Sequence, residues 1–264
     1  MVSRLGVLCF MLVHNVRVYN YMDGQQIRIY KKPICKCEEI WDPELTEKKD
    51  KEKKGVKDEE RSNTVSKNRT IQKVYEVVRS NMWEYFVTLT FDPQKVDSFD
   101  YAEVSKVLSQ WLKNMKKDHA PNLKYIIVPE LHKSGRYHFH GLIADIGNMK
   151  LIDSGHKTPS GDVIYNLGNY KLGFTTATKI KDVSRVSTYI TKYITKELCT
   201  TTVNKKRYWC SRNLNEVDIT DYCMTREEIE TMLDSLSDNI QYAKTIDVPI
   251  LDQSVRILEV SEND

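Results

Sequence analysis

The alternation of apolar and polar residues predicts a β-hairpin near the start of the chain. It runs through residues 16–34 and is interrupted at Asp23-Gly24, a pair that favours tight hairpin turns. Residues 42–61 are instead dense in Lys, Glu and Asp, with almost no apolar residues. Such a stretch cannot bury a core. We therefore expect a solvated helix or linker here, and an N-terminal extension over residues 1–70.

Apolar patterning then resumes and predicts a domain over residues 71–215. Residues 83–91 are rich in aromatic and β-branched side chains, as is typical of a strand. A helix is predicted over residues 99–117, with Ser98 as its N-cap. The apolar stripe of this helix consists of Tyr101, Val104, Leu108, Trp111, Leu112 and Met115. Residues 173–180 predict a further strand.

Two histidines occupy alternate positions in a predicted strand over residues 137–144. Because strand side chains alternate between faces, His138 and His140 project from one face and Phe139 turns into the core. Paired imidazoles on a rigid strand can bind a divalent metal ion. They need a third, oxygen ligand and open positions for a substrate.

Glu130 is the candidate for that third ligand. It ends the preceding predicted strand, residues 124–130, and a turn signal follows it. A three-residue loop over residues 134–136, with Gly135 at a positive φ, would place Glu130 opposite His140.

Loop length decides whether this ligand set can form. A two-residue loop at Ser134-Gly135 would turn Glu130 to the wrong face, so the site requires a loop of odd length. The register that serves Glu130 also places His132 opposite His138, and His132 is therefore the alternative ligand.

A doubled Tyr-x-x-Lys motif lies in a second predicted helix, residues 182–198, whose apolar stripe can lie on the sheet. The four residues stand at i, i+3, i+4 and i+7, which puts them on one helix face. They are Tyr189, Lys192, Tyr193 and Lys196. Either they form a chemical site, or the tyrosines rim the core while the lysines reach solvent.

Residues 205–212 interleave cations with aromatic rings. This mixture suits single-stranded nucleic acid, because bases stack on rings and phosphates contact Lys or Arg. The alternative is an edge strand with solvated charges. The candidate DNA-binding residues are Lys205, Lys206, Arg207, Tyr208, Trp209 and Arg212.

The net charge of +3 hides a strong asymmetry along the chain. Residues 1–215 carry 37 Lys and Arg against 24 Asp and Glu, whereas residues 216–264 carry 3 against 13. A basic body with an acidic C-terminal segment suggests a polyanionic partner, most simply nucleic acid. No apolar run is long enough to span a membrane, so we expect a cytoplasmic protein without a membrane partner.

Three segments, in this order, resemble the HUH endonucleases. The closest resemblance is to the rolling-circle replication initiators (Rep) of small plasmids and single-stranded DNA phages. The segments are Phe86-Val-Thr-Leu-Thr-Phe91, Tyr137-His-Phe-His-Gly-Leu-Ile143 and Tyr189-Ile-Thr-Lys-Tyr-Ile-Thr-Lys196. The third is the most specific. Relaxases of the same superfamily carry the tyrosine before the histidines, so the order here argues against them.

This resemblance implies an α+β fold with a central antiparallel β-sheet flanked by helices, related to RNA-recognition and ferredoxin-like folds. It implies that His138, His140 and Glu130 hold a divalent metal, Mg or Mn. It also implies that Tyr189 and Tyr193 are nucleophiles. Lys192 and Lys196 follow them, and a nearby positive charge would favour the phenolate.

The activity implied is rolling-circle initiation. Single-stranded DNA at a replication origin would be nicked and rejoined through a 5′-phosphotyrosine, leaving a 3′-OH primer. A helicase and a polymerase of a bacterial host would be partners, because the chain has no Walker-type motif. Two other hypotheses are an HUH transposase, against which the tandem tyrosines weigh, and a non-catalytic nucleic-acid-binding module.

Overall fold

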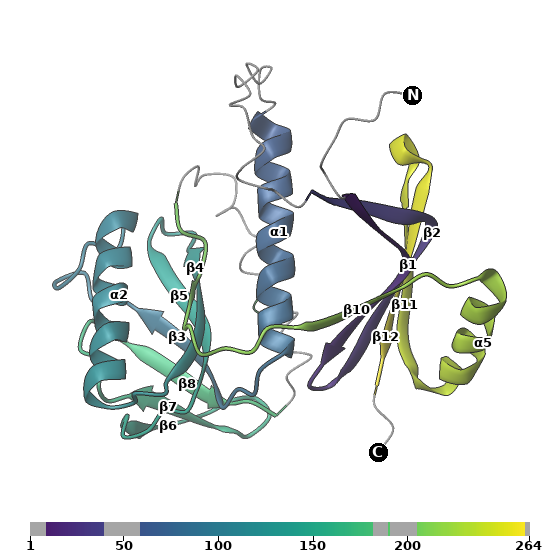
Figure 1. Ribbon diagram of the computed structural model, residues 1–264. Coiled ribbons are helices and arrows are strands. Elements are labelled where there is room, and N and C mark those ends of the chain that lie inside the picture. Colours follow the sequence, from purple (N-terminus) through teal and green to yellow (C-terminus); the bar gives the residue numbers. More distant parts are fainter. Residues whose placement is uncertain (1–8, 40–58, 182–189, 191–204, 262–264) are drawn as a thin grey trace. The chain divides into compact units, whose positions relative to one another are not determined.

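Two compact units make up the chain. The structure is a computed structural model that describes residues 9–39, 59–181, 190 and 205–261. The central unit spans Asp58–Glu216, and the terminal unit combines Met1–Lys57 with Val217–Asp264. Each is built on its own antiparallel sheet (Figure 1), which confirms the expected α+β class. None of the described helices is long and apolar enough to cross a membrane.

A seven-stranded sheet forms the middle of the central unit, in the order β6-β7-β8-β3-β5-β4-β9. Strand β3, Tyr85–Thr90, lies between β5, Tyr137–Ala144, and β8, Thr175–Lys179. The other strands are β4 Lys124–Leu131, β6 Leu151–Lys157, β7 Val163–Leu167 and β9 Trp209–Cys210. Every pair in the sheet is antiparallel, as the sequence led us to expect of the central sheet.

Helix α2, Tyr101–Asp118, covers one face of this sheet. Its predicted apolar stripe is buried in full and packs against Leu89 and Phe139. The N-cap differs from the prediction, because Asp100 rather than Ser98 accepts the backbone N–H of Ala102. Asp at an N-cap satisfies a free helical donor as well as Ser does, and the chain enters the helix two residues later than expected.

Helix α1, Glu59–Arg79, packs on the opposite face. Val74 and Val78 meet Ile126 and Leu142 there, and all four side chains are fully buried. The helix begins within the charged stretch that the sequence assigned to a solvated helix or linker.

The terminal unit is a five-stranded sheet in the order β10-β1-β2-β12-β11. Its strands are β1 Cys9–Tyr21, β2 Gly24–Glu39, β10 Asp218–Tyr222, β11 Ile240–Val248 and β12 Gln253–Val260. Helix α5, Arg226–Leu236, starts at a capping box formed by Thr225 and Glu228 and packs its apolar side on this sheet. Short 3-10 turns, η1 Ser237–Asn239 and η2 Pro249–Leu251, flank β11.

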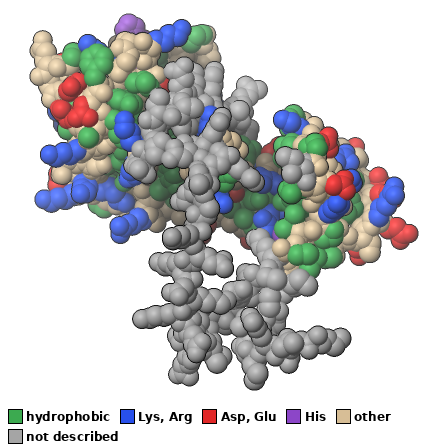
Figure 2. Space-filling model, turned by 90° about the horizontal axis from the view of Figure 1, so that it is seen from above, with side chains coloured by type: hydrophobic (Ala, Val, Ile, Leu, Met, Phe, Trp, Pro, Cys, Tyr) green, Lys and Arg blue, Asp and Glu red, His purple; other side chains and the backbone are tan. Residues whose placement is uncertain are grey.

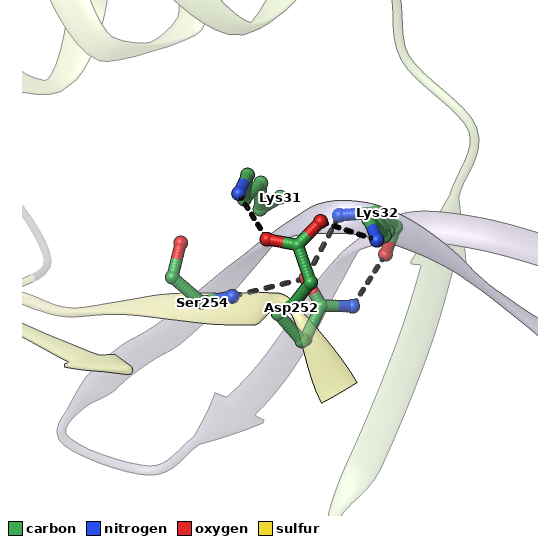
Figure 3. A network of polar contacts seen from close by, with 5 residues as sticks. Lys31, Lys32, Asp252 and Ser254 are labelled. Carbon is green, nitrogen blue, oxygen red and sulfur yellow. Dashed lines mark hydrogen bonds and ion pairs between the residues drawn. The ribbon is translucent and has the colours of Figure 1, made fainter. Parts of the chain in front are cut away.

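Polar contacts hold η2 and the start of β12 against β2 (Figure 3). The Asp252 carboxylate accepts Lys31 at 2.8 Å and Lys32 at 2.7 Å. Gln253 bonds both the N–H and the carbonyl of Lys32. Asp252 itself adopts a left-handed conformation, φ 45°, which ends the 3-10 turn and lets β12 begin.

The predicted N-terminal hairpin is present, with Gly24 at φ 131° in its turn. Its surroundings differ from the prediction. The sequence separated an N-terminal extension, residues 1–70, from an acidic segment, residues 216–264, whereas here strands from both regions pair in one sheet. The Arg17 guanidinium, for example, bonds both carboxylate oxygens of Asp221, at 2.5 and 2.7 Å. The acidic segment therefore has a partner within the chain.

Candidate functional site

The β4–β5 hairpin fixes the face on which the candidate ligands lie. Glu130 stands directly opposite His138, and the His132 N–H bonds the Arg136 carbonyl, so the loop between them has three residues. Gly135 has φ 81°, as expected. The predicted register is wrong by two residues, because it paired Glu130 with His140. A shift of two preserves the face on which each side chain lies.

Glu130 nevertheless reaches His140 diagonally across the hairpin. The His140 Nε2 lies 2.7 Å from the Glu130 Oε2, and both side chains are largely buried, 10% and 16% exposed. Diagonal neighbours on one sheet face are within reach of long side chains. The Phe86 ring stacks beside the imidazole, with 6.0 Å between ring centroids. The Glu130–His140 pair is thus a defined contact on a rigid part of the sheet.

Two threonines of β3 contact the other nitrogen of each histidine. Thr88 stands opposite His140 and Thr90 opposite His138. The Thr88 Oγ1 lies 3.1 Å from the His140 Nδ1, and the Thr90 Oγ1 lies 3.4 Å from the His138 Nδ1. Hydroxyls on the Nδ1 side orient a ring and direct its Nε2 away from β3. Sequence reasoning did not assign this role, although strand parity had already put both threonines on one face.

His138 lies in a half-buried setting that favours its neutral form. Burial lowers the pKa of His138, the neighbouring charge of His132 lowers it further, and Glu130 acts in the opposite direction. The His132 and His138 rings lie 5.2 Å apart. His132 sits at the turn, where its Nδ1 accepts the N–H of Ser134. A neutral imidazole is the form that can bind a metal ion.

The residues fit a metal site by chemistry rather than by preassembled geometry. Across the part of the chain that the structure describes, no three His, Cys, Asp or Glu side chains are grouped as a metal site. Two imidazoles and one carboxylate on a single sheet face are nonetheless a donor set suited to a divalent ion. Glu130, His138 and His140 could therefore hold one, in place of the proton that Glu130 and His140 share.

Thr88→Val is expected to weaken metal-dependent activity by roughly 10- to 100-fold, the usual effect of losing an outer-shell partner of a metal-binding histidine. Valine keeps the shape of threonine but removes the hydroxyl beside the His140 Nδ1. The measurement is the metal concentration that gives half-maximal DNA cleavage. Thr178→Val, on the same face of β8, is the control and should leave that concentration unchanged. Equal values for wild type and Thr88→Val would contradict the orienting role.

The basic segment over residues 205–212 lies along the β4 edge of the sheet, but one of its rings has a different role from the one expected. Trp209 is 3% exposed and belongs to the core beneath α2. Its ring meets Phe139 edge-on at 5.2 Å, and its Nε1 donates to the Ser109 Oγ. A ring buried to this degree cannot stack on a base, so the expectation that Trp209 contacts DNA through its ring is wrong.

The other members of the segment remain at the surface or close to it. Lys205 and Arg212 are exposed, and the Arg207 guanidinium bonds Ser66 on α1 at 2.9 Å. The Lys206 ammonium lies over the Trp209 ring, 5.1 Å from its centroid. Tyr208 is partly buried, and burial raises its pKa. The predicted interface is therefore a cationic edge.

Trp209→Ala is expected to destabilise the central unit by about 3–5 kcal/mol, the usual cost of deleting a buried Trp side chain. Denaturant unfolding followed by circular dichroism measures this loss. Trp209→Phe, which keeps a ring against Phe139, should cost much less. Wild-type stability in Trp209→Ala, together with weaker DNA binding, would restore the stacking role.

The proposed nucleophiles lie outside the described residues. Tyr189, Lys192, Tyr193 and Lys196 are all in this category. Ile190, between them, is described as helical and fully buried, and it belongs to the cluster that contains Leu142 and Phe86. Because Phe86 stacks on His140, Ile190 packs on the face of the sheet that carries the histidines.

The order of these segments can now be compared with known families. Residues 84–198 match a family of replication-associated proteins, the ORF2 type. No curated protein and no solved structure gives a significant match to the chain. The family match agrees with the resemblance to replication initiators drawn from the sequence.

The region that matches this replication-associated family contains most of the candidate site. It begins one residue before β3 and includes Glu130, both histidines and the doubled Tyr-x-x-Lys motif. Thr88 and Thr90 also lie inside it. The cationic segment over residues 205–212 and the whole terminal unit lie outside it.

Proposed function

We propose that the protein initiates DNA replication by cutting one strand of DNA at an origin. One observation carries the proposal. Within a region that matches a replication-associated family, Glu130, His138 and His140 share one face of a rigid sheet, and Ile190 of the Tyr-x-x-Lys segment packs on that same face. The cut is metal-dependent and site-specific, and it is the first step of rolling-circle synthesis.

A divalent ion, Mg or Mn, held by Glu130, His138 and His140 would polarise the scissile phosphate as a Lewis acid. Thr88 and Thr90 keep the two rings oriented for this task. Tyr189 or Tyr193 supplies the nucleophile. A phenol with a pKa of about 10 is weak at neutral pH, and the charge of Lys192 or Lys196 favours its phenolate.

The covalent step exchanges one phosphodiester for another. The phenolate oxygen bonds to phosphorus, the bond from phosphorus to the 3′ oxygen breaks, and that oxygen takes a proton. The products are a 5′-phosphotyrosine and a free 3′-OH. Because the ester retains the bond energy, the strand can be rejoined without a nucleotide cofactor. The 3′-OH primes a host polymerase, and a host helicase separates the strands.

A library of single-stranded oligonucleotides, incubated with the full chain and either Mn or Mg, tests the proposal. The expected product is DNA that remains bound to protein after denaturation, together with a fragment that a polymerase can extend. Chelation of the metal should prevent both. Tight binding with no cleavage under any metal would support a non-catalytic DNA-binding module instead.

A further inference from the structure

An exposed aromatic ring lies on the same face as the histidines. Phe174 is 59% exposed, although Phe is among the side chains most often buried. It stands immediately before β8, and its carbonyl accepts the N–H of Thr90 at 2.9 Å. The next bond in this ladder joins the Asp92 N–H to the Leu172 carbonyl, so the pairing with β3 continues beyond the end of β8.

Register places the Phe174 side chain in line with the candidate ligands. Ala177 faces the core beneath α2, and Thr176 stands opposite Thr88 on the other face. Phe174 has the parity of Thr176, so it lies on the histidine face. One row across the sheet therefore reads Glu130, His138, Thr90, Phe174. Two strand spacings, roughly 10 Å, separate Phe174 from His138.

Gly173 holds this position by close backbone packing. A Cβ there would lie 2.2 Å from the Thr90 carbonyl oxygen and 2.6 Å from the Asp92 nitrogen. No side chain fits such a gap, so the backbone before Phe174 is pressed against the end of β3. The ring therefore projects from a fixed point on the sheet, as a stacking surface must if it is to hold a ligand in register.

Cations surround the ring at this end of the sheet. Lys171 is exposed, and the ammonium of Lys95 bonds its carbonyl. Arg136 precedes β5 and lies over the Phe99 ring, 5.2 Å from its centroid. Figure 2 shows Lys and Arg side chains grouped on the surface of the central unit. An aromatic face among cations fits a single-stranded nucleic acid better than an apolar protein partner.

We propose that Phe174 stacks on a base of the single-stranded DNA whose phosphate reaches the Glu130, His138 and His140 site. The inference rests on the proposed function for that phosphate. At about 3.4 Å per stacked nucleotide, two or three nucleotides bridge the separation of roughly 10 Å. The strand then runs across the sheet, from the cationic β4 edge over the histidines to Phe174, and the ring sets which nucleotides lie beside the metal ligands.

The test compares two labelled strands of equal length, one of dT nucleotides and one of abasic sugars, binding to the full chain in a metal chelator. Wild type should prefer the dT strand. Phe174→Ala should bind dT roughly 5- to 100-fold more weakly, the range expected for loss of one stacked base. Its affinity for the abasic strand should not change. Phe174→Trp should keep the preference, and Phe174→Leu, apolar but without a π face, should lose it.

Met82→Ala provides a matched control. Met82 is 61% exposed and precedes β3 at the end opposite Thr90, so its variant should bind both strands as wild type does. The inference is overturned if Phe174→Ala binds dT normally, if it weakens both strands equally, if Phe174→Leu keeps the preference, or if wild type has none.

The outcome is independent of the cleavage assay. A chain that never nicks DNA but shows the dT preference and its loss in Phe174→Ala would keep the stacking site and remove the proposed function. A chain that nicks DNA with unchanged dT binding in Phe174→Ala would keep the function and remove the stacking site.

Discussion

A chain carrying both Tyr189→Phe and Tyr193→Phe is expected to form no covalent adduct with DNA. Each substitution removes only a hydroxyl and keeps the ring, so it tests chemistry rather than packing. Without a phenolic oxygen no ester to phosphorus can form. The measurement is protein-linked DNA that survives denaturation, mapped to a residue by mass spectrometry. The loss should be complete, because no other group is positioned as the nucleophile in this mechanism.

The single variants separate the roles of the two tyrosines. If the two are interchangeable, each single Phe variant retains part of the wild-type adduct, and we expect Tyr189 to act first. Loss of all adduct in one variant, with the other unaffected, would make this a single-tyrosine enzyme. An adduct that persists in the double variant would overturn the assignment. DNA binding by the double variant in a chelator, equal to wild type, shows that the fold survives.

His138→Ala and His140→Ala are each expected to abolish metal-dependent cleavage. The loss should exceed the roughly 10- to 100-fold that an outer-shell partner contributes, because a direct donor is removed. Glu130→Ala should raise the metal concentration required, since its carboxylate contacts the His140 Nε2. The measurements are a metal titration of cleavage and a direct metal-binding isotherm, with circular dichroism as the check on folding.

His132→Ala is the matched control for this group. Its side chain is exposed at the β4–β5 turn, where the Nδ1 accepts a backbone N–H. We therefore expect cleavage close to wild type. Full activity of Glu130→Ala at low metal, combined with a loss in His132→Ala, would show that His132 and not Glu130 is the third ligand.

Periodicity gave the sides of the strands more reliably than their alignment. The alternation in the β4–β5 hairpin put Glu130, His138 and His140 on one face, and they lie there. It could not distinguish two registers that differ by two residues, since both satisfy the same pattern. The turn decided between them: the loop closes at His132 and Arg136, one residue earlier on each side.

Burial of the aromatic residues was harder to predict. Trp209 stands among cations in the sequence, a pattern shared by stacking surfaces and by sheet edges that cover a core. Its pairing with Ile127 on β4 turns the ring inward. Phe174 shows the opposite error: its strand was predicted, but its exposed ring drew no attention, because exposure depends on what packs nearby rather than on local pattern.

Pairing between distant strands also escaped the sequence. Strand β2 pairs with β12, and β1 pairs with β10, across most of the chain length. Periodicity shows that a segment alternates, but it does not name the segment's neighbour. The acidic composition after residue 215 therefore suggested a solvated tail, whereas half of the terminal sheet is built from it.

The shared sheet of the terminal unit has a consequence for synthesis of the protein. The central unit is contained in Asp58–Glu216 and is complete before β12 has been translated. Strand β2 must wait for β12 while about 200 residues are added, which at 5–20 residues per second takes roughly 10–40 s. The ribosome thus releases the central unit first and leaves the β1–β2 hairpin with unpaired edges until β12 has been made. Slow codons or premature termination ahead of β12 would leave these edges open to pairing between chains.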